Sequence, residues 1–253
     1  MVDSTVQRVV LVTGASRGIG AEAAAQFGAA GAQVIVNFRE KRKRAQTVVD
    51  GIVAAGGSAS TLGADVSDPD DVAEMVVEIG RTFGRLDTLV LNASGGLERD
   101  ADPGYALRLN RDAQVNLATA MLPLMPAGGR IVFVTSHQAH FIHEKDDVPQ
   151  GYAPIARSKR AGEDALRALI PEFQERGIGF TVVSGDMIDG TIIVRLLERR
   201  DPISVESRRA AGPLPTVEDF ARVIVRAGTE AAAIGQTFYV GGDDYVAAGA
   251  LTR

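Results

Sequence analysis

The stretch VVLVTGASRGIG, at residues 9–20, constrains the fold of this 253-residue chain more than any other. Four apolar residues lead into three glycines, Gly14, Gly18 and Gly20, and an alanine-rich run follows. This order predicts a buried strand, a glycine turn and the start of a helix. The first N–H groups of a helix have no intrahelical partner, and glycine lets a phosphate approach them without a Cβ in the way. The stretch therefore predicts a dinucleotide-binding turn.

Strand-like and helix-like segments alternate along the rest of the chain, which predicts a parallel sheet with helices on both faces. No linker rich in Pro, Gly or Ser and no internal repeat interrupts this alternation. The sequence therefore predicts one α/β domain over residues 1–253, a doubly wound, Rossmann-type parallel sheet of about seven strands. We expect strands near 8–13, 33–38, 58–62, 86–91, 130–135, 178–184 and 236–240, and helices near 18–30, 40–55, 69–83, 104–125, 154–175 and 217–228.

Composition narrows the classes of function. The net charge of −5 argues against nucleic acid or an acidic membrane surface as the main partner. The absence of cysteine excludes disulfides and thiolate metal sites. No apolar run approaches the ~18 residues of a membrane span, and the first ten residues lack the apolar segment of a secretory signal. We therefore expect a cytoplasmic protein that acts on a small molecule.

A competing motif overlaps the glycine turn. The segment GASRG, at residues 14–18, matches the G-x-S-x-G nucleophile elbow of the α/β-hydrolases. A serine hydrolase would need an acid and then a histidine later in the chain. The three histidines, His137, His140 and His143, lie together in mid-chain, and none follows in the last 110 residues. We therefore favour the dinucleotide site over the hydrolase.

The spacing Thr13-Gly14-x-x-x-Gly18-x-Gly20 differs from the general G-x-G-x-x-G fingerprint and resembles the short-chain dehydrogenase/reductase family. The resemblance implies hydride transfer between a nicotinamide cofactor and a carbonyl or alcohol substrate, in a protein that is a homo-oligomer. Together with the positions of the strand ends, it indicates the following cofactor-binding residues: Gly14, Ser16, Arg17, Gly18, Ile19, Gly20, Asn37, Arg39, Asp65, Val66, Asn92, Ala93, Ser94, Lys159, Gly185, Ile188 and Thr191.

The residues after the second expected strand favour NADP(H) over NAD(H). An NAD-binding protein has an acidic residue here for the ribose 2′-hydroxyl, whereas arginine accommodates a 2′-phosphate. This chain has Arg39 and no acid, and Arg17 lies within reach in the glycine turn. The alternative is that residues 39–44 are only a solvated basic helix face.

Other strand ends carry family-like residues. Asp65 resembles the residue that accepts from the adenine amino group, although it could equally be a turn residue. Residues 92–94 resemble the Asn-Ala-Gly motif, with serine in place of the first glycine. The resemblance implies that Ile188 closes the amide side of the nicotinamide and that Thr191 touches a phosphate.

Residues from about 186 to 215 resemble the substrate-covering lid of the family. This segment is rich in arginine. Its basic residues are either a solvated helix face or an attraction for an anionic substrate: Arg195, Arg199, Arg200, Arg208 and Arg209.

Three catalytic positions of the family have counterparts. Asn110 resembles the asparagine of the proton relay, Ser136 the serine that orients the substrate oxygen, and Lys159 the lysine that lowers the tyrosine pKa and binds the ribose. A free tyrosine has a pKa near 10, so a nearby cation is needed to make it an acid–base group at neutral pH.

The catalytic tyrosine does not fit the family spacing Tyr-x-x-x-Lys. Ile155 stands four residues before Lys159, and Tyr152 stands seven before it. The 23-residue separation of Ser136 and Lys159 also exceeds the family norm, and this length could bring Tyr152 into the site. Tyr152 is our provisional acid.

The long connection leaves two further alternatives. Its histidines could hold a metal, but their spacing matches no zinc signature, so we expect none; His137 or His140 could also replace the tyrosine as proton donor. Because Ile155 stands at the usual place of the acid, the chain could instead be a catalytically impaired dinucleotide-binding protein, acting as a sensor or interaction partner.

Overall fold

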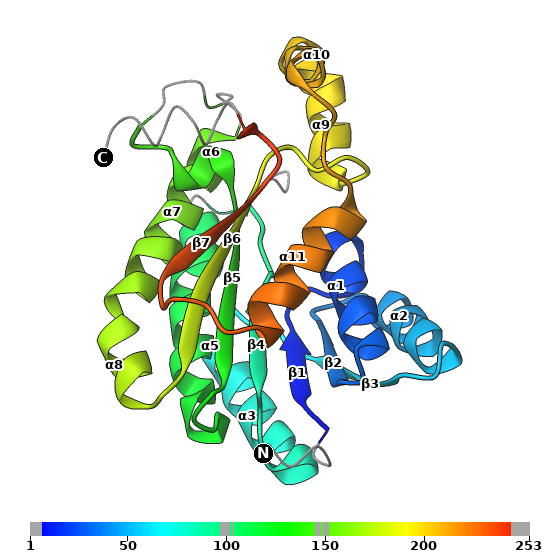
Figure 1. The fold of residues 1–253 in the computed structure, drawn as a ribbon, viewed down its shortest axis with the longest axis vertical. Helices are drawn as coiled ribbons and strands as arrows, with labels where there is room; N and C mark the ends of the chain where they lie inside the picture. Colours follow the sequence, from blue (N-terminus) through cyan, green and yellow to red (C-terminus); the bar gives the residue numbers. More distant parts are fainter. Residues whose placement is uncertain (1–6, 97–101, 103, 145–147, 149–151, 244–253) are drawn as a thin grey trace.

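The structure is a computed structural model, and it describes residues 7–96, 102, 104–144, 148 and 152–243. One parallel sheet runs through the molecule (Figure 1). Its strands lie in the order β3 (Ser58–Gly63), β2 (Gln33–Phe38), β1 (Val9–Val12), β4 (Thr88–Leu91), β5 (Arg130–Ser136), β6 (Gly179–Gly185) and β7 (Gln236–Val240). Strand order runs outward from β1 in both directions, which confirms the expected Rossmann-type fold and its seven strands.

Four of the expected helices are present with ends within two residues of the prediction: α1 (Gly18–Ala29), α2 (Arg42–Ala54), α3 (Pro69–Phe83) and α11 (Val217–Thr229). The expected helix at 154–175 is two helices, α7 (Ala153–Ala168) and α8 (Ile170–Glu175). Pro171 lies in the first turn of α8, and a proline there cannot continue the α7 hydrogen-bond ladder.

The expected helix at 104–125 is also interrupted. It consists of α4 (Tyr105–Leu107), the π-helical turn η1 (Arg108–Asp112), α5 (Ala113–Met121) and the 3₁₀ turn η2 (Leu122–Leu124). Three helices were not expected at all: α6 (His137–His140), α9 (Ile192–Arg200) and α10 (Pro202–Ala211). No helix was expected between 136 and 154, and this is wrong for His137 and His140, which lie in α6.

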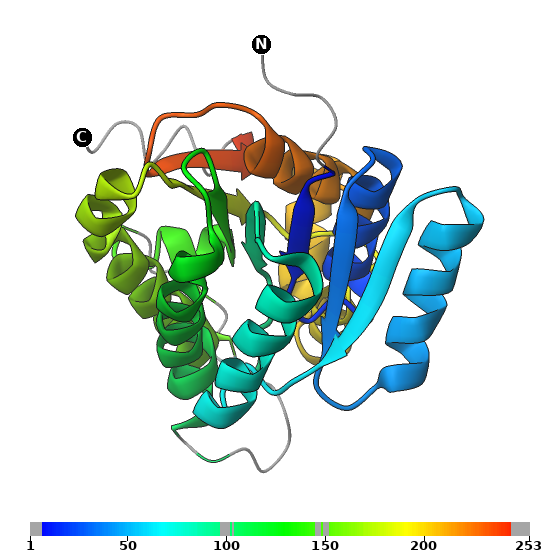
Figure 2. The same ribbon diagram turned by 90° about the horizontal axis from the view of Figure 1, so that it is seen from below.

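Alternate residues of each strand face opposite layers of helices. Leu11, Ile35 and Leu89 belong to the core beneath α3, α5 and α7, whereas Val10 and Val34 belong to the core beneath α1, α2 and α11. Seen from below, the two layers enclose the sheet (Figure 2). Because both of its faces are buried, the central strand β1 is a continuous apolar run.

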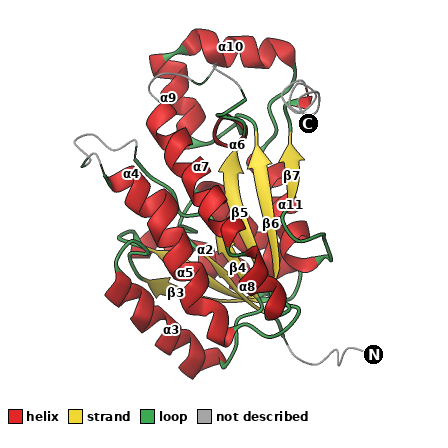
Figure 3. Ribbon diagram, turned by 90° about the vertical axis from the view of Figure 1, so that its left-hand side faces the viewer, coloured by secondary structure: helices red, strands yellow, loops and turns green. Residues whose placement is uncertain are grey.

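The carboxyl ends of the strands define the edge where polar residues gather. Figure 3 shows α6, α9 and α10 beyond the arrowheads of β5 and β6. Ser136 at the end of β5 lies beside Gly185 at the end of β6 in the sheet register. Among the described residues, no helix combines the length and apolarity that crossing a bilayer requires.

Thr13 joins the ends of two central strands, β1 and β4. Its buried hydroxyl donates to the Val90 carbonyl oxygen at 3.1 Å and accepts from the N–H groups of Asn92 and Ala93, both at 3.0 Å. The Asn92 amide returns a hydrogen bond to the Thr13 carbonyl oxygen at 2.9 Å. These bonds hold the glycine turn against residues 92–93.

Replacing Thr13 by valine should therefore destabilise the fold. The variant leaves the Ala93 N–H without its acceptor, whereas the Asn92 N–H keeps its second bond, to the Val90 carbonyl oxygen at 3.1 Å. It should lower the free energy of unfolding by about 1–3 kcal/mol in urea denaturation. Thr47→Val, which removes an exposed hydroxyl on α2, is the control and should change it by less than about 0.5 kcal/mol. Equal effects in the two variants would show that the Thr13 bridge does not hold the turn.

Candidate active site

The glycine turn between β1 and α1 has the shape of a phosphate cradle. Gly14 and Gly18 have φ angles of 62° and 57°, which favour glycine. A Cβ on Gly20 would lie 2.5 Å from Asn92 Nδ2, so no larger residue fits there without a shift. Helix α1 begins at Gly18, and its N-cap residue Arg17 makes no side-chain cap. The N–H groups of this first turn are thus available to a phosphate, as NADP(H) requires.

Asn37 supports this turn from within the protein. Its side chain is buried; its Oδ1 accepts from the Gly14 N–H at 3.2 Å, and its Nδ2 donates to the carbonyl oxygens of Leu62 and Ala64. Both ends of the amide are therefore occupied by the chain itself. Asn37 therefore fixes the glycine turn against the end of β3.

Arg39 and Asp65 lie together at the ends of β2 and β3. The exposed Arg39 guanidinium donates to the Tyr105 hydroxyl at 2.6 Å and lies 3.9 Å from Asp65 Oδ2. Asp65 Oδ1 accepts from both the N–H and the hydroxyl of Ser67, which makes Asp65 a turn residue as well. Its second oxygen, Oδ2, faces Arg39.

The remaining expected cofactor residues lie at the same edge of the sheet. Thr191 caps α9, because its hydroxyl accepts from the Val194 N–H at 3.4 Å and donates to the Ile188 carbonyl oxygen at 2.8 Å. The others are placed as follows: Ser16, Arg17 and Ile19 in the turn before or at the start of α1; Val66 after β3; Ala93 and Ser94 after β4; Gly185 at the end of β6.

Asn110 lies in the π-helical turn and faces α7. Its buried amide donates to the Gly95 carbonyl oxygen and to Ser158 Oγ, both at 2.9 Å. A Cβ on Gly162 of α7 would overlap the carbonyl oxygen of Asn110. The contact brings α7 so close to η1 that only glycine fits there. Ser158 and Gly162, one residue before and three residues after Lys159, are not among the predicted site residues.

Ser136 and Tyr152 meet at the start of α7. Their hydroxyl oxygens lie 3.1 Å apart in a hydrogen bond. Ser136 also caps α6, since its Oγ accepts from the Ala139 N–H at 3.3 Å. Tyr152 is the residue that precedes α7, and Ile155, one turn later, is buried in the apolar interior. The hydroxyl pair therefore forms although Tyr152 stands seven residues before Lys159.

Burial shifts the pKa of both Tyr152 and Lys159. It raises the pKa of Tyr152, against a smaller lowering by the Ser136 hydrogen bond. It lowers the pKa of Lys159 to about 8. Among the described residues, Lys159 is not one of the groups that shift the tyrosine pKa. Tyr152 is thus a neutral phenol at neutral pH.

The two histidines of α6 are buried and hydrogen-bonded at both ring nitrogens. His137 bonds Ser184 Oγ at 2.8 Å and the Gly241 carbonyl oxygen at 2.9 Å. His140 bonds Glu163 Oε2 at 2.9 Å and the Tyr239 hydroxyl at 3.1 Å. Their rings therefore join α6 to neighbouring elements. All four ring nitrogens of His137 and His140 thus bond to residues other than Ser136 and Tyr152.

Helices α9 and α10 are joined to the sheet edge by ion pairs. Arg208 Nε lies 2.7 Å from Asp186 Oδ2, a buried carboxylate directly after β6. Arg209 lies 3.2 Å from Asp189 and 2.7 Å from Glu198. Two of the five arginines considered for anion attraction are thus engaged with carboxylates of the chain itself.

The family follows from a match over most of the chain. The sequence profile of the short chain dehydrogenase family matches residues 8–201. The chain belongs to the short-chain dehydrogenase/reductase family.

Curated relatives of this chain are named reductases. Versicolorin reductase stcU of Emericella nidulans is 34% identical over 183 residues, which are 70% of this chain and 67% of the relative. Versicolorin reductase 1 of Aspergillus parasiticus is 40% identical over 138 residues, 52% of this chain and 53% of the relative. The chain thus spans between about half and two thirds of the length of these relatives.

Two solved structures of similar proteins contain NADP. The angucycline C-6 ketoreductase LanV with bound NADP is 27% identical, with a TM-score of 0.79 over 93% of this chain and 95% of that one. A short chain dehydrogenase from Burkholderia cenocepacia J2315 in complex with NADP is 29% identical, with a TM-score of 0.79 over 93% and 96%.

The lowered pKa of Lys159 gives a stability prediction. Lysine 159 releases its proton near pH 8 in the folded chain and near 10.5 when unfolded. Between these values the unfolded chain binds more protons, so folding stability due to this group rises with pH. The melting temperature of the cofactor-free wild type, minus that of Lys159→Met, should therefore increase from pH 7.5 to 10.

Lys43→Met, at an exposed position of α2, is the matched control and should give a difference that does not change with pH. A flat difference for Lys159→Met would contradict the burial of the Lys159 amine.

Proposed function

We propose that this protein is an NADP(H)-dependent oxidoreductase that transfers a hydride between the nicotinamide and a carbonyl or alcohol substrate. The observation that carries the proposal is the 3.1 Å hydrogen bond between Ser136 and Tyr152. It places a hydroxyl pair at the carboxyl edge of the sheet, beside the helix that carries Lys159. This is the edge at which ligands of open parallel sheets bind.

Tyr152 is the proposed acid. In the direction of reduction, negative charge develops on the carbonyl oxygen, and a neutral phenol within hydrogen-bond reach can donate its proton there. Ser136 holds the phenol and orients the substrate oxygen through the same hydroxyl. The phenol is protonated at neutral pH, so its proton is present for transfer, although burial raises its pKa and makes it a weaker acid than a free tyrosine.

NADP(H), when bound, supplies or accepts the hydride. We assign its phosphates to the glycine turn and its ribose to Lys159. The Lys159 amine has already lost much of its hydration in the folded chain, so binding the ribose costs little further desolvation. The Asn110 amide bonds Ser158 Oγ and the Gly95 carbonyl oxygen, and so holds both in place between the glycine turn and Lys159. Arg39 is the proposed ligand of the 2′-phosphate, and the NADP-bound neighbours support this choice of cofactor.

The proposed substrate is a small ketone, quinone or alcohol, covered by a lid at about 186–215. The ion pair of Arg208 with Asp186 is what would hold α10 over the sheet edge. Named relatives include reductases of naphthalene and versicolorin compounds, so polycyclic aromatic ketones belong in the first assay panel. We further propose a single domain that works as a cytoplasmic homo-oligomer.

Replacing Tyr152 by phenylalanine tests the acid. The variant should lose at least about 100-fold in kcat for NADPH-dependent reduction, because a positioned acid contributes about that much or more. Its dissociation constant for NADPH, measured by fluorescence, should stay within about twofold of wild type, because the hydroxyl does not contact the glycine turn. Tyr239→Phe, at a tyrosine of β7, is the matched control and should retain activity.

Unchanged turnover in Tyr152→Phe would remove Tyr152 from the mechanism. Tight NADPH binding by the wild type, with no turnover of aliphatic ketones, aromatic ketones or quinones, would instead favour the dinucleotide-binding alternative.

Replacing Arg39 by alanine tests the choice of cofactor. Loss of a charge-assisted hydrogen bond to phosphate should raise KM for NADPH about 10- to 100-fold. KM for NADH, which lacks that phosphate, should change little. Arg81→Ala, at an exposed arginine of α3 that pairs with Glu78, is the control. An equal rise for both cofactors would show that Arg39 does not bind the 2′-phosphate.

A further inference from the structure

A buried charge network ties α6 to α7 behind the proposed catalytic pair. His140 Nδ1 bonds Glu163 Oε2 at 2.9 Å, and Glu163 Oε1 bonds Arg167 Nε at 2.9 Å. The Glu163 side chain is fully buried, and that of His140 is 4% exposed. Because a carboxylate only accepts hydrogen bonds, His140 Nδ1 must donate. The proposed reaction uses neither group.

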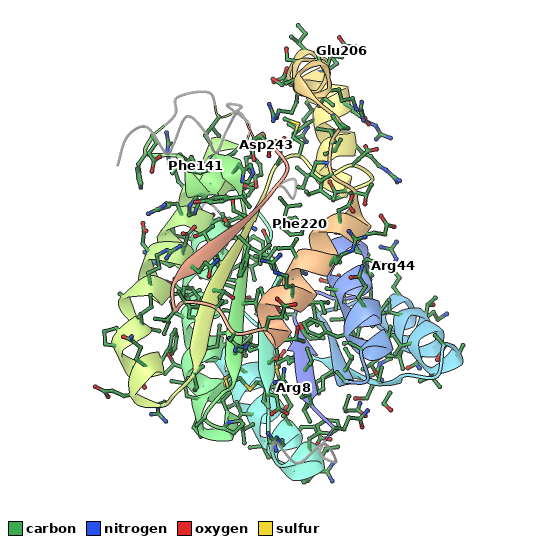
Figure 4. All side chains as sticks on the ribbon, viewed as in Figure 1. Arg8, Arg44, Phe141, Glu206, Phe220 and Asp243 are labelled. Carbon is green, nitrogen blue, oxygen red and sulfur yellow. The ribbon has the colours of Figure 1, made fainter. Side chains whose placement is uncertain are left out.

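The network also reaches β7. Arg167 donates to the Gly235 carbonyl oxygen at 2.7 Å and to Thr237 Oγ1 at 2.8 Å. His140 and Phe141 pack against Tyr239, with ring centroids 5.5 and 5.7 Å apart. Figure 4 labels Phe141 at this corner, beside α6. Three elements thus meet at one buried imidazole.

The consequence for the site comes from the shortness of α6. Ser136 caps its first turn, and His140 ends it, so both residues belong to one rigid turn of helix. At its far end this turn is fixed twice to α7: His140 bonds Glu163, and the Arg160 guanidinium donates to the His140 carbonyl oxygen at 2.6 Å. A shift of α6 along α7 would therefore move Ser136 away from Tyr152.

We propose that the His140–Glu163 pair is a positioning device that holds Ser136 Oγ against the Tyr152 hydroxyl. The sheet pairing of Ser136 with Gly185 fixes its backbone at the end of β5, and the Gly162–Asn110 contact fixes α7. The buried pair adds a direct connection between α6, which Ser136 Oγ caps, and α7, which Tyr152 precedes. The inference rests on the proposed function, because it assigns a task within the same reaction.

A pair of near-isosteric variants separates the two bonds of His140. In His140→Asn the amide stands in for Nδ1, so the bond to Glu163 is kept and that to Tyr239 is lost. In His140→Gln the amide stands in for Nε2, so the bond to Tyr239 is kept and that to Glu163 is lost. His143→Gln, at an exposed histidine, is the matched control for the second substitution.

The rate of hydride transfer in a single turnover should fall about 10- to 100-fold in His140→Gln, because small displacements of a catalytic group have effects of this size. It should stay within about threefold of wild type in His140→Asn and His143→Gln. The dissociation constant for NADPH should not change in any of them, since His140 lies away from the glycine turn.

A double-mutant cycle with Ser136→Ala decides between positioning and general support of the fold. If His140 acts through Ser136, adding His140→Gln to Ser136→Ala should cause no further loss in rate. An equal loss in both backgrounds, or equal losses in His140→Asn and His140→Gln, would overturn the proposal. If His140→Gln does not fold, Glu163→Gln enters the same cycle with the same criterion.

The outcomes for the two proposals are distinguishable. Turnover by the wild type together with an unaffected His140→Gln would overturn the positioning role alone. No turnover by the wild type would overturn both, because no reaction would remain for the pair to assist.

Discussion

The close approach of α7 to the π-helical turn is the constraint on which the site depends. Gly162 faces the backbone carbonyl of Asn110, where any Cβ would overlap the oxygen. Only because the helix can lie this close does the Asn110 amide reach Ser158 at 2.9 Å. The same packing sets the axis of α7, and with it the places of Lys159 near its middle and of Tyr152 before its start. Such a contact leaves little freedom to α7, since protein interiors are packed without slack.

Much of the fold could be predicted because it rests on local chemistry. The apolar run before Gly14 and the free helix start after it determine a strand, a turn and a helix independently of distant residues. The alternation of elements then favours a parallel sheet whose central strands are buried on both faces. The interruption after Ala168 was not predicted, although Pro171, in the first turn of α8, is a sequence signal for it. The π-helical turn has no such signal in the sequence, because it is imposed by packing against α7.

The site could be predicted only as far as it follows strand ends. Ser136 was expected at the end of an apolar strand, and it lies at the end of β5. The bonds of the Asn37 amide to Gly14 and Leu62 could not be read from the sequence, because they join three strand ends. The meeting of Ser136 with Tyr152 could not be read from spacing, because seven residues before Lys159 is two helical turns and Tyr152 precedes the helix. The bond of His140 to Glu163 could not be read from the sequence either, because it joins positions 23 residues apart on two helices. Long-range contacts of this kind depend on how α6 packs.

The central claim is that Tyr152, and not a residue at position 155, delivers the proton. A crystal structure with NADPH and a ketone bound tests it most directly, through the distances from the Tyr152 hydroxyl to the substrate oxygen and to Ser136 Oγ. The account predicts that both are hydrogen-bond distances, about 2.6–3.2 Å, with the carbonyl carbon facing nicotinamide C4. A Tyr152 hydroxyl turned away from the substrate, with the Ile155 side chain facing the carbonyl, would contradict it.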